Sequence, residues 1–288
     1  MAPEQLIVNG IALGCIIALA AVGLTLTYGI LRLSNFAHGD FMTLGAYFTW
    51  LANTKGINIW ISIILGVLGT IAAMLLSEFL LWRPMRNARA SATTLIIISI
   101  GLALFIRNGI IFIWGGDNQS YDLPVLPAID ILGVKVAYFR IIVVIMAVVA
   151  IALLHILLQN TKIGKAMRAV ADNLDLARVS GINVERVVIW TWVINGTLTA
   201  FGGAMYGLIT AVRPNMGWFL ILPMFASVIL GGIGNPYGAI VGALIIGVTQ
   251  ELSVAIPGLG SEYKIGVALL LMVLVLLIRP QGLFRSTI

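Results

Sequence analysis

The feature that most constrains the fold of this chain is the spacing of its charged residues, which leaves long apolar runs without any charge. The longest runs from Pro214 to Gln250. About 20 consecutive apolar residues are enough for a helix to cross the hydrocarbon core of a bilayer. Charged residues are 10% of the chain, whereas a soluble domain has about 25%. A water-facing surface of this size cannot be built from so few charges. The runs therefore predict an all-α, polytopic transmembrane helix bundle.

Charges, prolines and glycines divide the runs into about eight to nine predicted spans within a single transmembrane domain, residues 1–288. We expect Arg83 and Pro84 to end the third span, and Pro257 and Gly258 the eighth. The count is eight if the second span is re-entrant, because irregular backbone is tolerated at depth where protein or water covers it. The predicted ranges are 5–31, 37–53, 57–81, 93–115, 140–160, 187–211, 217–231, 237–256 and 264–279.

The orientation follows from the distribution of lysine and arginine, which concentrate in cytoplasmic segments of membrane proteins. The segments 82–91 and 162–186 are basic, and so is the tail with Arg279 and Arg285, whereas the polar stretch 116–139 is acidic. Nine alternating spans put all three basic segments on one side. We therefore predict an outside N-terminus and a cytoplasmic C-terminus.

The rest of the composition excludes several classes of function. The basic residues behind the net charge of +6 lie in a few short loops, so membrane orientation explains them and no nucleic-acid partner is expected. Cys15 is the only cysteine, which leaves no disulfide framework and no thiolate metal site. The sequence has no Walker-type phosphate loop, no HExxH and no paired CxxC. We predict no enzyme activity, no cofactor and no metal.

One stretch in the second basic segment has the pattern of an amphipathic helix. Its apolar residues repeat at helical spacing and form one stripe, and Gly181 is suited to end the helix in a left-handed conformation. Such a helix can rest on lipid headgroups or dock in a protein groove. The acids among its charges favour the groove, but the pattern leaves both open. The stripe comprises Ile163, Met167, Val170, Leu174 and Ala177.

Polar residues beside the predicted spans are candidates for a translocation pathway. Asn35, His38 and Asp40 lie at the junction of the first two spans. They form either a polar turn that satisfies helix ends or a His–Asp pair that contacts a substrate or relays protons. Their position at the junction favours the turn. Arg107 interrupts the fourth span, as a pathway residue or as one that pairs or snorkels.

Glycine-rich breaks suggest where helices end or approach closely. Gly231, Gly232, Gly234 and Asn235 divide the longest apolar run in two. Beyond them, Gly238 and Gly242 form a GxxxG face, as Gly203 and Gly207 do earlier. Such faces predict close packing of helices and no chemistry.

Four segments together resemble a known family. They are GLTLTYGILRLSNFAHGDFMTLGAY, GKAMRAVADNLDLARVSGIN, GGIGNPYGAIVGALIIG and LIRPQGLF. With them the chain resembles the LivH-type permease subunits of branched-chain and other neutral amino-acid ABC importers. The last segment departs slightly, since Arg285 stands where a glycine commonly follows GLF.

The resemblance implies a transmembrane permease domain in the inner (plasma) membrane of a bacterium, surrounded by lipid. It implies a second permease subunit, often a related paralogue, two ATP-hydrolysing subunits, and an extracytoplasmic binding protein that delivers the amino acid. Residues 162–186 would then contain a coupling helix that sits in a groove of an ATPase subunit. The residues expected in it are Gly164, Met167, Arg168, Val170, Asp172, Asn173, Leu174, Ala177 and Gly181.

The resemblance also implies a weak substrate site, since the binding protein supplies affinity. Helix ends and backbone groups in the break at 231–236 could meet the zwitterion. A permease for urea or another small polar solute remains an alternative. A secondary transporter driven by ions is a further one, but it would need coupling carboxylates near the midplane, and none is securely placed there.

Overall fold

Apolar runs and polar caps set the ends of the long helices in the computed structural model, which describes residues 3–284 except 125, 132, 257, 259 and 280. Asparagine or serine side chains cap α3, α5, α9 and α11 by accepting a backbone N–H of the first turn. The long helices are α1 (Pro3–Leu31), α2 (His38–Asn53), α3 (Ile59–Ser77), α5 (Ala92–Trp114), α6 (Tyr138–Asn160), α9 (Val184–Ile209), α10 (Met216–Gly231), α11 (Pro236–Ser253) and α12 (Lys264–Ile278).

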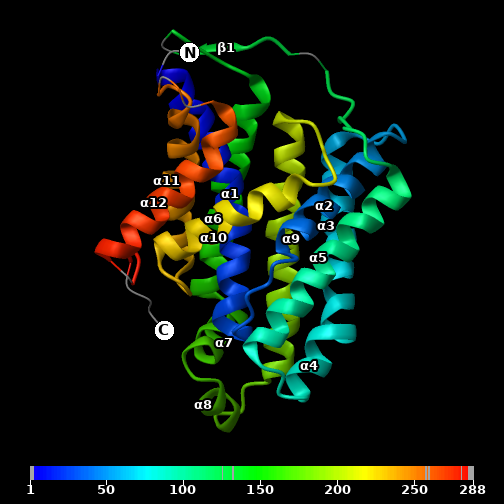
Figure 1. Cartoon of the computed structure of the whole chain (residues 1–288). Helices are drawn as coiled ribbons and strands as arrows, with labels where there is room; N and C mark the ends of the chain where they lie inside the picture. The colour runs from blue at the N-terminus through cyan, green and yellow to red at the C-terminus, as the bar shows by residue number, and fades with distance from the viewer. Residues whose placement is uncertain are drawn as a thin grey trace.

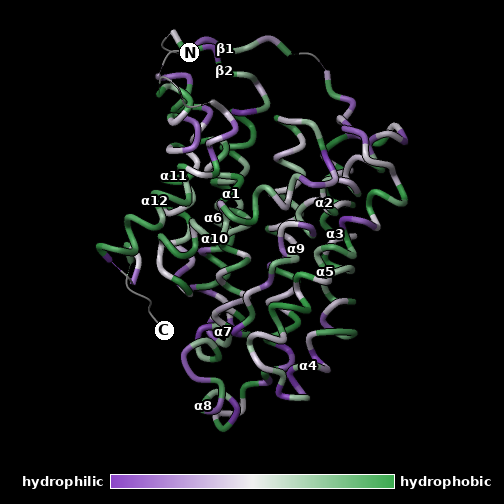
Figure 2. The backbone as a smooth tube through the Cα atoms, in the orientation of Figure 1, coloured by the Kyte–Doolittle hydropathy of each residue, from purple (hydrophilic) through white to green (hydrophobic). Residues whose placement is uncertain are grey.

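The predicted polytopic helix bundle is confirmed. Six helical segments in the described ranges are long and apolar enough to cross a membrane, and α10 is apolar but shorter. Figure 2 shows hydrophobic colour along the helices and hydrophilic colour gathered towards the ends of the bundle. The finer count of eight to nine spans and the orientation of the termini stay predictions.

The sequence predicted that the third span ends at Arg83 and Pro84. The helical path instead continues past these residues. A π turn, η1 (Glu78–Trp82), follows α3 directly and leads into α4 (Arg83–Asn87). In the turn, the Arg83 N–H donates to the Glu78 carbonyl. Pro84 lies in the first turn of α4, where the N–H that proline lacks is not needed. The helical path therefore continues to Asn87.

Two helices, α1 and α9, form the centre of the bundle and are buried over most of their length. α1 packs against α11 and α9, and α2 lies between α3 and α9. Close approaches use glycine: a Cβ on Gly10 would lie 2.6 Å from the Val248 Cα. By contrast few residues of α5, α6 and α12 are buried, and the surface that they leave uncovered is, in a membrane protein, the surface for lipid or another subunit.

The start of α2 is an irregular feature inside the bundle. After α1 the chain returns towards the middle of the molecule in extended form before α2 begins (Figure 1). There Gly39 lies against Gly217 in the first turn of α10, so closely that a Cβ on Gly39 would be 2.2 Å from the Gly217 oxygen. The two short helices therefore start against each other within protein, where irregular backbone is tolerated.

The polar stretch 116–137 lies at the end of the bundle opposite α4, α7 and α8 (Figure 1). It contains a small antiparallel hairpin, β1 (Ile129–Ile131) and β2 (Val134–Val136), which the all-α prediction did not include. Tyr121 anchors the stretch by donating to the Ala46 carbonyl at 3.3 Å. Burial raises the pKa of the Tyr121 phenol, so that this donor stays protonated.

Candidate functional site

The predicted amphipathic helix is two helices, α7 (Lys162–Asp172) and α8 (Leu174–Val179). The single-helix prediction was wrong at Asn173, whose backbone is extended and whose side chain accepts from the Leu176 N–H. An asparagine that caps the next helix in this way must itself leave helical geometry. The predicted end at Gly181 is confirmed by its φ of +82°.

The apolar stripe of α7 and α8 faces the chain's own bundle. Met167, Val170 and Ala177 are buried, and Gly164 lies against the last turn of α6, where a Cβ would be 2.3 Å from the Leu157 oxygen. Leu174 is half-buried, whereas Arg168, Asp172, Asn173 and Gly181 are exposed. The stripe therefore holds α7 and α8 on the bundle and is not a free docking face.

The exposed apolar surface of this region lies on α8 instead. Leu176 and Val179 have exposed fractions of 64% and 87%, and Figure 1 shows α8 projecting beyond the end of the bundle. Neither residue was predicted from the sequence, because both lie out of phase with the stripe. Two apolar residues on an otherwise charged face were the available signal.

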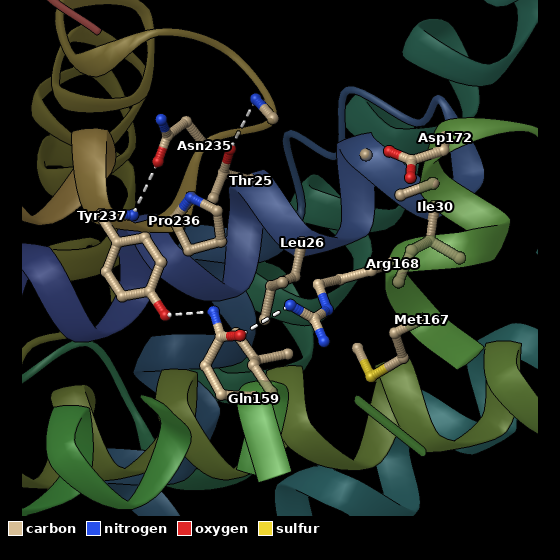
Figure 3. A pocket seen from close by; sticks show the side chains of 14 residues that line it. Thr25, Leu26, Ile30, Gln159, Met167, Arg168, Asp172, Asn235, Pro236 and Tyr237 are labelled. Carbon is tan, nitrogen blue, oxygen red and sulfur yellow. Dashed lines mark hydrogen bonds between the residues drawn. The ribbon is translucent and has the colours of Figure 1, made fainter. Parts of the chain in front are cut away.

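A cavity of about 350 Å³ brings α7 together with the predicted break between α10 and α11 (Figure 3). Arg168 and Asp172 line one side, and Gly234 and Asn235 line the other. The Gly234 N–H donates to the Thr25 hydroxyl of α1 at 2.9 Å. Two groups of residues that the sequence could not connect therefore line the same cavity.

A chain of hydrogen bonds crosses from α7 to α11 beside this cavity. Arg168 donates to the side-chain Oε1 of Gln159 at 2.6 Å, and the side-chain Nε2 of Gln159 donates to the Tyr237 hydroxyl at 3.2 Å. The Nδ1 atom of His155 lies 2.7 Å from the same hydroxyl. These bonds connect α7 with the first turn of α11 through Gln159 of α6.

Gly231 and Gly232 are occupied by packing and line no described cavity. The Gly231 and Leu230 carbonyls accept from the Phe284 and Leu283 N–H groups near the end of the described chain. Gly232 has a φ of +107°, a conformation that favours glycine. Within the predicted pathway group, the cavity is therefore lined by Gly234 and Asn235.

Asp40 and Arg107 form a buried ion pair. Two hydrogen bonds of 3.0 and 3.1 Å join the guanidinium to the carboxylate, and the guanidinium lies 4.5 Å from the ring centre of Trp218 in α10. The pairing interpretation of Arg107 is thus confirmed. The pair connects α2 and α5, 67 residues apart in the chain.

His38 and Asp40 have separate partners and form no direct pair, which speaks against the less favoured alternative of a His–Asp relay. His38 Nε2 is 2.8 Å from the Ala20 carbonyl and 3.2 Å from the Thr199 hydroxyl. Asn35 accepts from the Ala37 N–H, in agreement with the expected polar turn. Asn35, His38 and Asp40 are all buried. The turn therefore lies in the core of the bundle and not on its surface.

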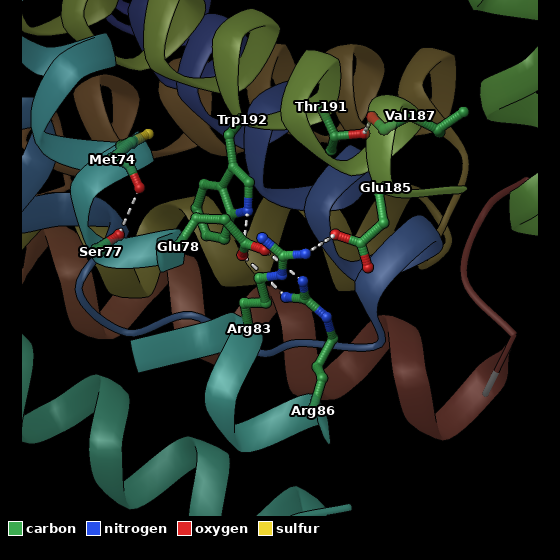
Figure 4. Close-up of polar contacts among 9 residues, drawn as sticks. All are labelled: Met74, Ser77, Glu78, Arg83, Arg86, Glu185, Val187, Thr191 and Trp192. Atoms are coloured by element: carbon green, nitrogen blue, oxygen red, sulfur yellow. Dashed lines mark hydrogen bonds and ion pairs between the residues drawn. The ribbon is translucent and has the colours of Figure 1, made fainter. Parts of the chain in front are cut away.

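A second cluster of charged residues joins η1 and α4 to α9 (Figure 4). The Glu78 carboxylate, which is buried, accepts from Arg86 and, at 2.8 Å, from the Trp192 indole. Arg83 pairs at 3.3 Å with Glu185 in the first turn of α9. Glu78 therefore pairs with Arg86, and Arg83 pairs with Glu185.

No cluster of three or more histidine, cysteine, aspartate or glutamate side chains in the described ranges could hold a metal ion. The site is thus made of cavities, helix ends, hydrogen bonds and ion pairs. Such an arrangement can bind and reposition a solute.

The model of one protein family, branched-chain amino acid transport system / permease component, matches residues 6–276. The chain belongs to this family. It is 32% identical to the high-affinity branched-chain amino acid transport system permease protein LivH of Salmonella typhimurium, over 97% of this chain and 94% of LivH. It is 25% identical to LivM, described as a permease protein of such a system in the same organism, over 92% of this chain and 67% of LivM.

The fold also has a relative among solved structures, described as an inward-facing conformation of a putative metal-chelate type ABC transporter. It aligns with a TM-score of 0.54 and 18% identity, covering 94% of this chain and 84% of that one. Membership of the permease family confirms the predicted LivH-type resemblance and the membrane permease of an ABC importer. It also makes the chain a transport component and not an enzyme.

Proposed function

We propose that this permease carries branched-chain or other neutral amino acids inward across the inner membrane of a bacterium. The observation that carries the proposal is the family match over residues 6–276. The partners we propose are two ATP-hydrolysing subunits, an extracytoplasmic binding protein and a second permease subunit. The similarity to both LivH and LivM supports a related second permease.

In this proposal the chain crosses the membrane nine times, with the N-terminus outside. The helix ends support it, because α4, α7 and α8 gather at one end of the bundle and the stretch 116–137 lies at the other (Figure 1). The first end carries the basic segments and is the cytoplasmic one by the positive-inside rule. Arg285, part of the basic tail, lies outside the described residues.

The coupling element in this proposal is α7 with α8, and its docking surface is the exposed face of α8. Leu176 and Val179 on that face have little to contact in their own chain, and Asp175 and Arg178 flank them. An apolar centre with a charged rim is typical of a protein interface. Force on α8 would reach α11 through α7 and the hydrogen bonds from Arg168 to Tyr237.

An ion-driven mechanism is less well supported, because the two carboxylates that are buried in the described part of the bundle have cationic partners. Asp40 pairs with Arg107, and Glu78 pairs with Arg86. A buried carboxylate whose two oxygens both accept from a guanidinium is poorly placed to bind a coupling ion or proton. Urea or another small polar solute remains the alternative substrate.

The docking surface can be tested with Val179→Glu and Leu176→Glu in the assembled complex. Each change puts a charge into the apolar centre of the interface. We expect binding of the ATPase subunit to weaken by about 2 kcal/mol or more, roughly thirtyfold, measured by titration against the permease in nanodiscs. ATP-driven uptake of leucine with the binding protein should fall in parallel.

Two controls separate docking from general damage. Val179→Thr keeps the shape of the side chain and should bind nearly normally, and Lys135→Glu puts the same glutamate side chain at an exposed position at the opposite end. Normal ATPase affinity and full uptake in both Val179→Glu and Leu176→Glu would overturn the docking assignment. Absence of ATP-dependent amino-acid uptake in the wild-type complex would overturn the proposed function.

A further inference from the structure

A second cavity, of about 540 Å³, lies at the end of the bundle opposite α7 and α8, among α1, α6, α9, α10, α11 and α12. Its volume is within the range of about 300–1,000 Å³ that small-molecule pockets occupy. In the proposed orientation this end faces the binding protein. The cavity is separate from the one beside α7, and nothing described above uses it.

The polar groups of this cavity carry both signs of charge. Arg140 lines it from the first turn of α6, and no carboxylate in the described part of the chain lies within ion-pair distance of it. Glu251 also lines the cavity, where Lys264 pairs with it at 2.6 Å. A guanidinium with unused donors thus shares the cavity with a carboxylate that is only partly buried.

Gln250 is the observation that points most directly to a ligand. Its side chain is 4% exposed, and its amide nitrogen has no hydrogen-bond partner in the described structure. Buried polar groups in proteins almost always have a partner. A donor that lines a cavity and is left unsatisfied there is suited to a ligand that brings an acceptor.

Much of the remaining wall of the cavity is apolar, although Asn9, Thr210 and Ser261 also line it. Leu13, Ile209 and Phe219 contribute to it from three different helices. A pocket that combines a few polar groups with such a wall selects ligands with a polar head and an apolar body.

We propose that this cavity binds the zwitterionic head of a free α-amino acid with a branched apolar side chain on its way into the permease. The amino acid's carboxylate meets Arg140 and the Gln250 amide, a fork of donors that suits a carboxylate. Its ammonium meets Glu251, and its side chain lies on the apolar wall. This inference deepens the proposed function and rests on it for the direction of transport.

The test measures protection of a thiol placed in the cavity of the purified complex. Thr210 lines the cavity and is exposed, so Thr210→Cys gives a site for a methanethiosulfonate reagent, and mass spectrometry of its peptide reports the rate. The probes are leucine, 3-methylbutylamine, which lacks the carboxylate, and 4-methylpentanoate, which lacks the ammonium. No binding protein or ATP is added.

We expect leucine alone to slow modification, about threefold at twice its Kd, because protection scales as 1 + [L]/Kd. Gln250→Leu in the same background should abolish the protection, while the control Lys135→Gln should keep it. If Gln250→Leu does not assemble, Arg140→Gln, which changes a half-buried side chain, takes its place with the same expectation.

The inference is overturned if leucine protects no better than the amine or the acid, or if Gln250→Leu is still protected. A lipid headgroup is a second zwitterion that could fill the cavity. Modification that is slow in phosphatidylethanolamine vesicles, fast in phosphatidylglycerol vesicles and indifferent to leucine would assign the site to lipid and overturn the inference. Leucine uptake by the same vesicles, given ATP and binding protein, reports separately on the proposed function.

Discussion

Arg107 is a residue whose partner in the fold cannot be read from the sequence. It is a lone charge in an apolar run, yet its side chain is only 14% exposed and is held by Asp40 and the ring of Trp218. A charge in such a place is costly unless it is paired. The pair therefore keeps α2, α5 and α10 together at the irregular start of α2. No local pattern could name Asp40 as the partner, because the two residues are 67 positions apart.

We expect Asp40→Asn to destabilise the protein by about 3–5 kcal/mol, because it leaves the Arg107 charge buried without its partner. The double change Asp40→Asn/Arg107→Gln removes both charges and should regain part of that loss. Thermal unfolding of the detergent-solubilised permease compares the variants in a double-mutant cycle. Asp117→Asn, in an exposed position, is the control and should leave the melting temperature unchanged. Equal losses in the single and double variants would refute the pairing argument.

At the scale of elements, close glycine contacts position the break that lines the cavity beside α7. Gly238 in the first turn of α11 faces Gly231 at the end of α10, and a Cβ on Gly238 would lie 2.2 Å from the Gly231 oxygen. The backbones themselves are in contact. This contact fixes Gly234 and Asn235 relative to α1 and α7, so the geometry of the cavity depends on it.

Gly238→Ala should therefore destabilise the permease by about 1–3 kcal/mol through overpacking, seen as a lower melting temperature. Gly101 is the matched control: it lies inside α5, and a Cβ there would meet nothing within 4 Å. Gly101→Ala should keep or raise stability, since alanine favours a helix over glycine by about 1 kcal/mol. A similar effect of both substitutions would mean that the α10–α11 contact is not tight.

Most ends of the long helices followed from the sequence because charges, prolines and caps act locally; the exception is the third span, where a π turn carries the helical path past Arg83 and Pro84. The break at Asn173 did not follow from the sequence, because the stripe from Ile163 to Ala177 keeps helical spacing across it, and only the capping geometry reveals two helices. The cavity residues were predictable as two separate groups, Arg168 and Asp172 on α7 and Gly234 and Asn235 before α11. Their meeting depends on tertiary packing through Thr25 and could not be read from spacing.

At the scale of the whole molecule, the same bundle has to serve two kinds of contact at its two ends. One end carries α4, α7 and α8 with the exposed apolar residues Leu176 and Val179. The other carries the stretch 116–137 and the cavity that contains Gln250. In the proposed function, docking to an ATPase and entry of a solute are separated by the full length of the helices. This separation has a function only if the two ends lie on opposite sides of the membrane.

Nine crossings predict which side each loop faces. Cysteines introduced by Thr54→Cys and Lys135→Cys should react with an impermeant maleimide in right-side-out vesicles, and those from Arg89→Cys and Ser180→Cys only in inverted ones. All four positions are exposed, and the native Cys15 is buried. The unmodified chain is the control and should stay unlabelled on both sides. Labelling after lysis confirms that each thiol is reactive. If Lys135→Cys and Ser180→Cys react from the same side, the nine-span arrangement is wrong, and the docking face and the amino-acid cavity cannot serve opposite sides of one membrane.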